Sequence, residues 1–163
     1  MYLEQKTNAD ISEDTIGTRI KARKEQLGFT VGTIASYSGL SENTIYSLMR
    51  DETKNPSIRT LHNLAFALNC EVPDLVPSLR GNATYANFVS MSSDMVVEQI
   101  GYICETFADS ISDMARKLQI SRSRLQDVLN NDQPPTLSLV QNICDTFALK
   151  YFDVIPISSA VPW

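Results

Sequence analysis

The stretch 41–50 combines a helical apolar pattern with side chains that could form hydrogen bonds to nucleic-acid bases. Ile45, Leu48 and Met49 are spaced to lie on one side of a helix. The opposite side then carries Glu42, Asn43, Tyr46, Ser47 and Arg50. An asparagine can bond bidentately to adenine, a glutamate can accept from cytosine, and a serine can bond to several bases. This pattern indicates a helix that contacts base edges in the major groove.

A second short helix is expected to hold this one against a core. Thr30 is suited to cap a short helix that carries Val31, Ile34 and Ala35. Gly39 supplies the left-handed conformation of a sharp turn, and Ser41 can cap the next helix. A short helix, a glycine turn and a second capped helix form a helix-turn-helix. The residues predicted to contact DNA are Thr30, Thr33, Ser41, Glu42, Asn43, Thr44, Tyr46, Ser47, Arg50, Lys54, Asn55, Arg19 and Arg23.

Three of these residues keep two interpretations each. Arg19 and Arg23 lie on the preceding helix, where they could contact phosphates or form part of a solvated face. Tyr46 could pack on a thymine methyl group or sugar, or it could cover a neighbouring side chain.

The chain repeats its pattern at an offset of 80 residues, which becomes 79 after a loop that is one residue shorter in the second copy. Leu40-Ser41 corresponds to Ile120-Ser121, and the stretch 56–58 (Pro-Ser-Ile) corresponds to 135–137 (Pro-Thr-Leu). A repeat of this kind predicts two units of about 60 residues, each near the lower limit for an independent core.

The second copy differs from the first where DNA contact would matter. Gln119 replaces the turn glycine, which costs roughly 1–2 kcal/mol if the residue is left-handed. Asp127 stands where Ser47 does and would face DNA unfavourably. A second DNA contact would use Ser121, Arg122, Ser123, Arg124 and Gln126. The alternative is a diverged duplicate used for dimerisation or partner binding.

Residues 16–77 resemble the Cro/C1-type (XRE) helix-turn-helix family. The resemblance rests on Arg19, Leu27-Gly28, Thr30, Ile34-Ala35, Gly39-Leu40-Ser41, Thr44-Ile45, Asn55-Pro56-Ser57, Leu61, Leu64-Ala65, Ala67-Leu68 and Asp74-Leu75. It implies a five-helix, lambda-repressor-like domain that binds a palindromic operator as a homodimer. Three positions depart from the family pattern. The family often has Gln where this chain has Val31, Glu where it has Met49, and Gly where it has Asp51.

The expected fold is all-α, with two tandem lambda-repressor-like domains of five helices each. The apolar spacing predicts helices throughout, and no alternating strand pattern of useful length is present. The expected segments are an N-terminal arm (1–15), the DNA-binding domain (16–77), a linker (78–93), the second domain (94–156) and a C-terminal tail (157–163).

The distribution of charge along the chain favours a DNA-binding role for its first half. The net charge is −5, which argues mildly against nucleic acid. Residues 16–77 hold seven basic and six acidic residues, whereas residues 81–163 hold five basic and nine acidic ones. Because DNA affinity depends on local positive charge, the first unit is better suited to DNA than the second.

The sequence offers little for catalysis, metal binding or membrane insertion. The odd set Cys70, Cys104 and Cys144 contains no CxxC pair, which favours core thiols in a reducing compartment, and His62 is expected at the surface. We find no glycine-rich phosphate loop and no nucleophile beside a base. We therefore expect no enzyme, no cofactor and no metal. The absence of a long apolar run predicts a cytoplasmic protein without membrane contact.

These observations predict a sequence-specific DNA-binding transcriptional regulator. A repressor of the phage or mobile-element type is favoured, with operator DNA bound by a homodimer. The alternatives are an antitoxin that represses its own operon, and a protein-interaction module that has lost DNA binding. A protein partner would be bound through residues 94–163.

Overall fold

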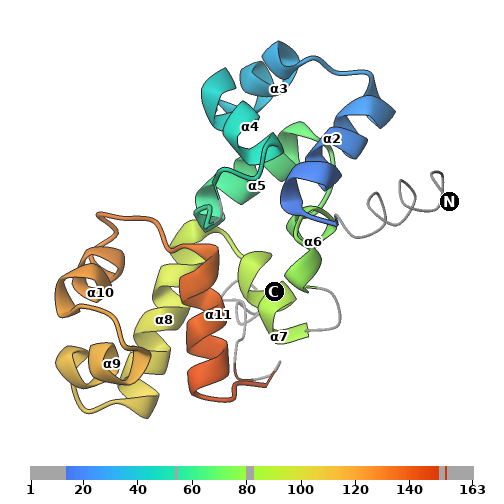
Figure 1. Ribbon diagram of the computed structural model, residues 1–163. Helices are drawn as coiled ribbons and strands as arrows, with labels where there is room; N and C mark the ends of the chain where they lie inside the picture. Colours follow the sequence, from blue (N-terminus) through green and yellow to red (C-terminus); the bar gives the residue numbers. More distant parts are fainter. Residues whose placement is uncertain (1–13, 54, 80–82, 151–152, 154–163) are drawn as a thin grey trace, which may run out of the picture. The chain divides into compact units, whose positions relative to one another are not determined.

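The computed structural model describes residues 14–53, 55–79, 83–150 and 153. All regular elements in this part of the chain are helices, apart from one isolated β-bridge, so the all-α prediction is confirmed there (Figure 1). The chain divides into two compact units. Unit 1 comprises Met1–Lys54 and Asn63–Ser78, and unit 2 comprises Asn55–His62 and Leu79–Trp163.

The first five helices in the described part of the chain lie wholly or partly in unit 1. They are α2 (Ile16–Leu27), α3 (Val31–Ser38), α4 (Glu42–Met49), α5 (Ile58–Ala67) and α6 (Val72–Leu75). Thr15 caps α2 in a reciprocal capping box with Thr18, and Gly28 ends that helix at a φ of 67°. The predicted caps of α3 and α4, Thr30 and Ser41, each accept a hydrogen bond from a backbone N–H inside their helix.

The core of unit 1 is aliphatic and comes from the apolar faces that the helical spacing predicts. Its side chains of at most 1% exposure are Ile20, Ile34, Ile45, Leu48, Leu64, Leu68, Leu75 and Val76. Each such burial contributes about 1.5–3 kcal/mol relative to an exposed side chain. Helix α4 packs against both α2 and α3, so this core fixes the helix that carries the candidate DNA contacts.

Asp51 joins the end of α4 to the start of α2. Its carboxylate accepts a hydrogen bond from the Gly17 N–H at 2.9 Å and another from the Thr15 hydroxyl at 2.7 Å. These bonds place a negative charge at the N-terminus of α2, where free N–H groups and the helix dipole favour it. Asp51 itself is left-handed, with a φ of 56°, which explains why a glycine would also fit its position.

The described part of unit 2 contributes five further helices. They are α7 (Ala83–Val89), α8 (Ser93–Phe107), α9 (Ile111–Leu118), α10 (Arg122–Leu129) and α11 (Leu137–Thr146), and the short 3-10 helix η1 (Pro77–Leu79) precedes them. Helix α10 packs against α8 and α9, and α11 packs against α7 and α9. The last helix expected in the second domain, near 151–155, and the C-terminal tail lie outside the described residues apart from Asp153.

Helix α7 occupies part of the segment that the sequence assigns to a linker. Phe88 and Val89 are both fully buried, and the Tyr85 hydroxyl donates a hydrogen bond to the carboxylate of Asp145 on α11. This hydrogen bond raises the pKa of Tyr85 to about 12. The serines and asparagines around α7 indicate a loop, but burial of its two apolar residues against α11 stabilises a helix there.

The left-handed conformation expected at Gln119 is confirmed, with a φ of 58° and a ψ of 41° at the end of α9. Replacing Gln119 by glycine is expected to raise the free energy of unfolding by about 1 kcal/mol, because glycine adopts this conformation without a Cβ clash. Denaturant unfolding measures the change. The same substitution at Gln126, inside α10, should lower the stability by about 1 kcal/mol. Destabilisation by both substitutions would contradict the strain assigned to Gln119.

Asp113 in the first turn of α9 makes stability depend on pH. The Asp109 N–H donates to its carboxylate, and Arg116 and Lys117 bind it at 2.6 and 3.1 Å, which lowers the pKa of Asp113 from 3.8 to about 2. A depressed folded-state pKa stabilises the fold above pH 4, and this contribution disappears as the pH falls from about 4 to 2. The variant Asp113→Asn should flatten the stability profile in that window, and an unchanged profile would contradict this role of Asp113. Thermal unfolding at successive pH values tests this expectation.

Candidate nucleic-acid interface

Helices α3 and α4 form the helix-turn-helix that the sequence predicts. The turn between them contains Gly39 at a φ of 73°, and the Ser38 hydroxyl accepts a hydrogen bond from the Leu40 N–H at 3.1 Å. Ile45 and Leu48 have no exposed surface and hold α4 to the core of unit 1. The inner face of α4 is therefore fixed, and the opposite face is available for contact.

The outer face of α4 brings together the residues predicted to contact base edges. Glu42, Asn43 and Tyr46 are exposed, and Ser47 is half-buried. Tyr46 keeps 42% of its surface exposed, and the Arg50 guanidinium lies 5.9 Å from the centre of its ring. The position of Arg50 is consistent with both interpretations of Tyr46, since a ring beside a cation still presents its other surface.

Arg50 also pairs with Glu52. The distance from Arg50 Nε to Glu52 Oε1 is 2.8 Å, and both side chains are more than half exposed, at 57% and 56%. An exposed ion pair of this kind contributes about 0–1 kcal/mol. Because breaking this ion pair costs little free energy, the Arg50 guanidinium can leave Glu52 and bind a phosphate instead.

Four hydroxyl residues of the predicted site lie at helix N-termini, where Thr30 and Ser41 are the caps and Thr33 and Thr44 are their partners. The Thr30 hydroxyl accepts from the Thr33 N–H at 3.1 Å, and the Ser41 hydroxyl accepts from the Thr44 N–H at 3.1 Å. The hydroxyl oxygens of Thr33 and Thr44 lie 3.0 and 2.9 Å from those of their capping partners. These residues therefore position the N-termini of α3 and α4, and Thr30 and Ser41 remain exposed.

Arg19 and Arg23 on α2 bind acceptors within unit 1. Arg19 donates to the Asp14 carboxylate at 2.8 and 3.0 Å and to the Asp74 carbonyl at 3.0 Å, and its side chain is only 14% exposed. The hydrogen bond with Asp14 raises the pKa of Arg19. Arg23 donates to the carbonyls of Leu68 and Asn69, each at 2.9 Å, at the end of α5. Both side chains thus tie α2 to later elements, a role that sequence reasoning missed because it depends on long-range contacts.

The remaining two residues of the predicted site are separated from this group. Lys54 lies outside the described residues. Asn55 belongs to unit 2, where its side-chain oxygen accepts a hydrogen bond from the Ser138 N–H at 2.9 Å. The structure therefore gathers the predicted base contacts on α4 but assigns other partners to Arg19, Arg23 and Asn55.

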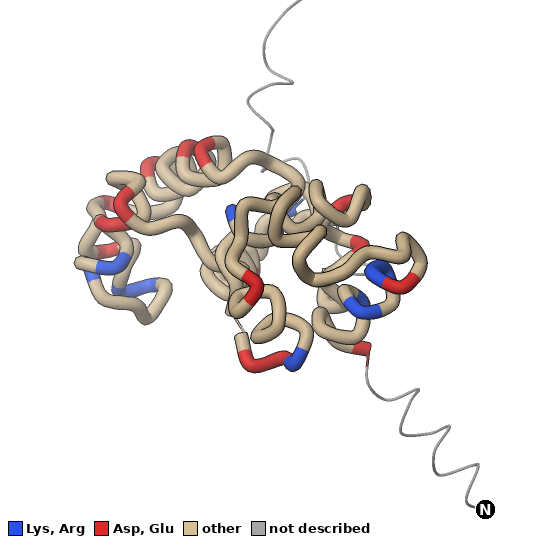
Figure 2. Tube along the Cα trace, turned by 90° about the horizontal axis from the view of Figure 1, so that it is seen from above, with Lys and Arg blue, Asp and Glu red and all other residues tan. Residues whose placement is uncertain are grey.

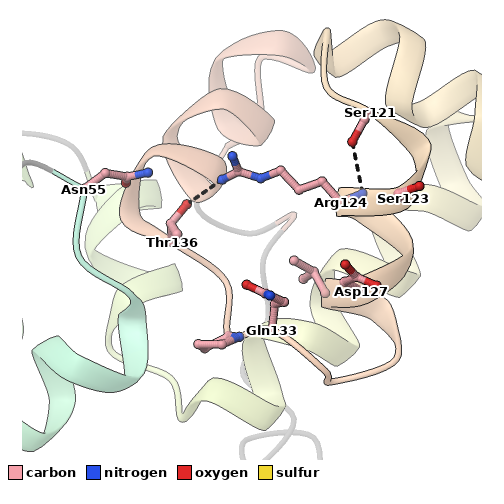
Figure 3. Close-up of a pocket in the computed structure, with 9 residues that line it drawn as sticks. Asn55, Ser121, Ser123, Arg124, Asp127, Gln133 and Thr136 are labelled. Carbon is pink, nitrogen blue, oxygen red and sulfur yellow. Dashed lines mark hydrogen bonds between the residues drawn. The ribbon is translucent and has the colours of Figure 1, made fainter.

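The residues of the predicted second contact lie on or beside α10. Arg122, Ser123 and Arg124 are exposed, Ser121 caps the helix, and Gln126 donates to the Asn130 side chain at 3.0 Å. A cavity of about 450 Å³ adjoins this helix; it is lined by Asn55, Ser121, Ser123, Arg124, Asp127, Val128, Gln133, Pro134 and Thr136. In Figure 3, Arg124 extends from α10 toward Thr136, to which it donates a hydrogen bond of 3.2 Å.

Each unit holds both basic and acidic residues (Figure 2), although α2 is mainly basic and α8 carries acidic residues alone. The lining of the α10 cavity shows the same mixture, because Arg124 and Asp127 both contribute to it. DNA binding would therefore depend on individual cations such as Arg50 and Arg122.

The structure confirms the expected core position for one of the three cysteines. Cys144 is buried, and Cys70 and Cys104 are half-buried. Burial raises the pKa of Cys104 to about 11 and that of Cys144 to about 12, so both are neutral thiols at pH 7 and poor nucleophiles. In the described part of the chain, no group of histidine, cysteine and acidic side chains has the arrangement of a metal site.

Comparison with known proteins relates part of the chain to a known family. Residues 19–77 match the model of the Cro/C1-type HTH DNA-binding domain. Neither the curated proteins nor the solved structures contain a significant match to the chain. None of the described helices combines the length and the apolar character that crossing a membrane requires. Residues 19–77 are thus similar to the Cro/C1-type HTH DNA-binding domain, and this similarity supports a role as a DNA-binding transcription regulator.

Proposed function

We propose that the protein is a sequence-specific repressor of the phage or mobile-element type, which binds operator DNA through α4 in the major groove. One observation carries this proposal: the polar outer face of α4 is exposed while Ile45 and Leu48 anchor the helix, within the segment that matches the DNA-binding family. A repressor acts by occupying its site, so its function requires shape and hydrogen bonding but no chemistry.

Each residue on the outer face of α4 has a role that follows from its chemistry. Asn43 pairs bidentately with an adenine, and Glu42 accepts from the amino group of a cytosine. Tyr46 packs on a thymine methyl group or a sugar. Arg50 binds a phosphate and exchanges its exposed pairing with Glu52 for that contact. Because the first three contact base edges and Arg50 contacts the backbone, their substitution should affect specificity and affinity differently.

The second unit is proposed to be a diverged copy of the first. The support comes from α9 and α10, which have the same lengths as α3 and α4 and are capped at the equivalent positions Ser110 and Ser121. Left-handed residues also recur at equivalent positions: Gly39 and Gln119, Asp51 and Asn131, Asn69 and Ala148. Exposed Arg122 and Ser123 then stand where α4 carries Glu42 and Asn43.

Selection of bound sequences from random duplex DNA tests the proposed function. The full chain should enrich a defined motif at moderate salt, and the affinity should fall as the salt concentration rises, because bound phosphates release counterions. The variant Asn63→Ala, at an exposed position of α5, serves as a control and should enrich the same motif. Failure of the wild-type chain to enrich any sequence would refute a stand-alone repressor.

A further inference from the structure

Two short segments of unit 2 pair with each other through reciprocal backbone hydrogen bonds. The Ile58 N–H donates to the Pro135 carbonyl at 2.8 Å, and the Leu137 N–H donates to the Pro56 carbonyl at 3.0 Å. Between them, Ser57 and Thr136 form an isolated antiparallel bridge. The segments 56–58 and 135–137 are called the paired segments below.

The paired segments occupy equivalent positions of the proposed repeat, 79 residues apart. Each consists of a proline, a hydroxyl residue and a branched aliphatic residue, and each leads into a helix. Ser57 accepts from the Thr60 N–H at 3.0 Å, and Thr136 accepts from the Leu139 N–H at 3.3 Å, so both hydroxyls cap the helix that follows. The two segments therefore have the same local structure as well as matching sequences.

The hydrogen bonds between the paired segments have the pattern of an isologous contact. In such a contact, residue i of one copy meets residue j of the other, and the reverse contact also forms. Here the aliphatic residue of each segment donates to the proline of the other. Two identical chains would make this pattern at a two-fold interface, whereas this protein makes it within one chain.

The pairing also uses the hydrogen-bonding capacity of both segments. The first N–H groups of a helix have no partner within that helix, and proline has no N–H to offer. Pro56, Pro135 and Ile58 are buried, and Leu137 keeps only 6% of its surface exposed. The N–H groups of Ile58 and Leu137 thus find their acceptors within the same chain. They are therefore unavailable for the same pairing with a second copy of the chain.

We propose that the protein is a one-chain counterpart of a two-fold dimer: a monomer that binds a duplex of two unlike half-sites, one through α4 and the other through α10. This inference rests on the proposed function. The half-sites differ because Glu42 and Asn43 suit cytosine and adenine, whereas their equivalents Arg122 and Ser123 suit guanine and several bases, respectively. Linking two binding modules in one chain raises their affinity without self-association.

Sedimentation of the full chain, alone and with the enriched duplex, tests this inference. We expect a monomer at all concentrations and one chain per duplex, with two unlike half-sites in the motif. A dimer in solution, two chains per duplex or two like half-sites would overturn the inference while leaving the proposed function intact. If no duplex is enriched, the proposed function fails. Sedimentation of the DNA-free chain then still tests the inference, because a dimer in that sample would contradict the proposed monomer.

A pair of variants at Leu137 tests the role of the paired segments. Leu137→Pro removes the donated N–H but suits the first position of a helix, and Thr136 is already extended, with a φ of −95° and a ψ of 161°. Leu137→Ala removes the side chain but keeps the N–H. For the duplex of two half-sites, the proline variant should bind about fivefold to tenfold more weakly than the alanine variant, because it also loses a backbone hydrogen bond.

A duplex that keeps only the α4 half-site provides the matched control, since both Leu137 variants should bind it equally. Equal binding of both variants to the complete duplex would contradict a role for the pairing. If Leu137→Pro loses its helical circular dichroism, the reciprocal donor gives a second test. Ile58→Pro and Ile58→Ala should then differ by the same factor, and equal binding of these two would overturn the inference.

Discussion

Replacing Gly17 by alanine is expected to lower the free energy of unfolding by about 3 kcal/mol, the upper end of the usual cost of overpacking. A Cβ atom at this position would lie 2.5 Å from the Met49 carbonyl oxygen and 2.7 Å from Asp51 Oδ2. The first of these atoms belongs to the backbone of α4 and cannot rotate away. To make room, α2 would have to move from α4, and the Gly17 hydrogen bond to Asp51 would be lost with it.

Gly32 in α3 provides the matched control for this prediction. A Cβ there would meet only the Thr30 hydroxyl oxygen at 3.7 Å and a Glu42 carboxylate oxygen at 4.0 Å, both at ordinary contact distances. Gly32→Ala should therefore raise the stability by about 0.5–1 kcal/mol, because alanine is the better helix former. Denaturant unfolding of both variants measures the contrast. Similar stabilities for the two would show that α2 and α4 do not pack as closely as described.

Replacing Asn43 by alanine is expected to weaken binding to the selected operator by about 1–3 kcal/mol, or roughly 5- to 150-fold, through loss of a bidentate contact with one base. The effect should be confined to one position of the motif, where the preference for adenine should disappear. Because Asn43 is exposed, the thermal stability of the variant should remain that of the wild type.

Titrations of operator variants by fluorescence anisotropy distinguish this specific contact from a general one. With Asn43→Ala, all four bases at the affected position should bind with similar affinity. Arg50→Ala should instead weaken binding to every sequence and reduce the salt dependence, as expected for a phosphate contact. A uniform loss of affinity for Asn43→Ala would place Asn43 away from the bases. The control Asn63→Ala should leave each of these affinities unchanged.

Local chemistry made the helix-turn-helix predictable. Thr30 and Ser41 have hydroxyls that cap helices, and Gly39 tolerates the left-handed turn, so these residues determine the ends of α3 and α4 without reference to the rest of the chain. The period of Ile45 and Leu48 then identifies the outer face of α4. The exposed residues on that face agree with the residues predicted for DNA contact.

Long-range contacts were not predictable in the same way. An arginine on a polar helix face has the same sequence pattern whether it contacts DNA or, like Arg23, the carbonyls of Leu68 and Asn69. The stretch around Phe88 has the sequence pattern of a linker. It is helical because it is buried against α11, and the local sequence does not reveal this long-range contact. Asp51 could be recognised from the sequence as the replacement of a glycine. The partner of its carboxylate could not, because the Gly17 N–H lies 34 residues away in sequence.

The contact between Asp51 and Gly17 also constrains how this domain can diverge. A mutation of Asp51 alone would leave the Gly17 N–H without its acceptor, whereas a larger residue at position 17 alone would collide with α4. The two positions should therefore change in concert during evolution. Unit 2 has different residues at both equivalent positions, Val97 and Asn131. The Asn131 side-chain amide donates to Asp94 in the first turn of α8, so the end of α10 contacts the start of α8 through a donor where Asp51 supplies an acceptor to the start of α2.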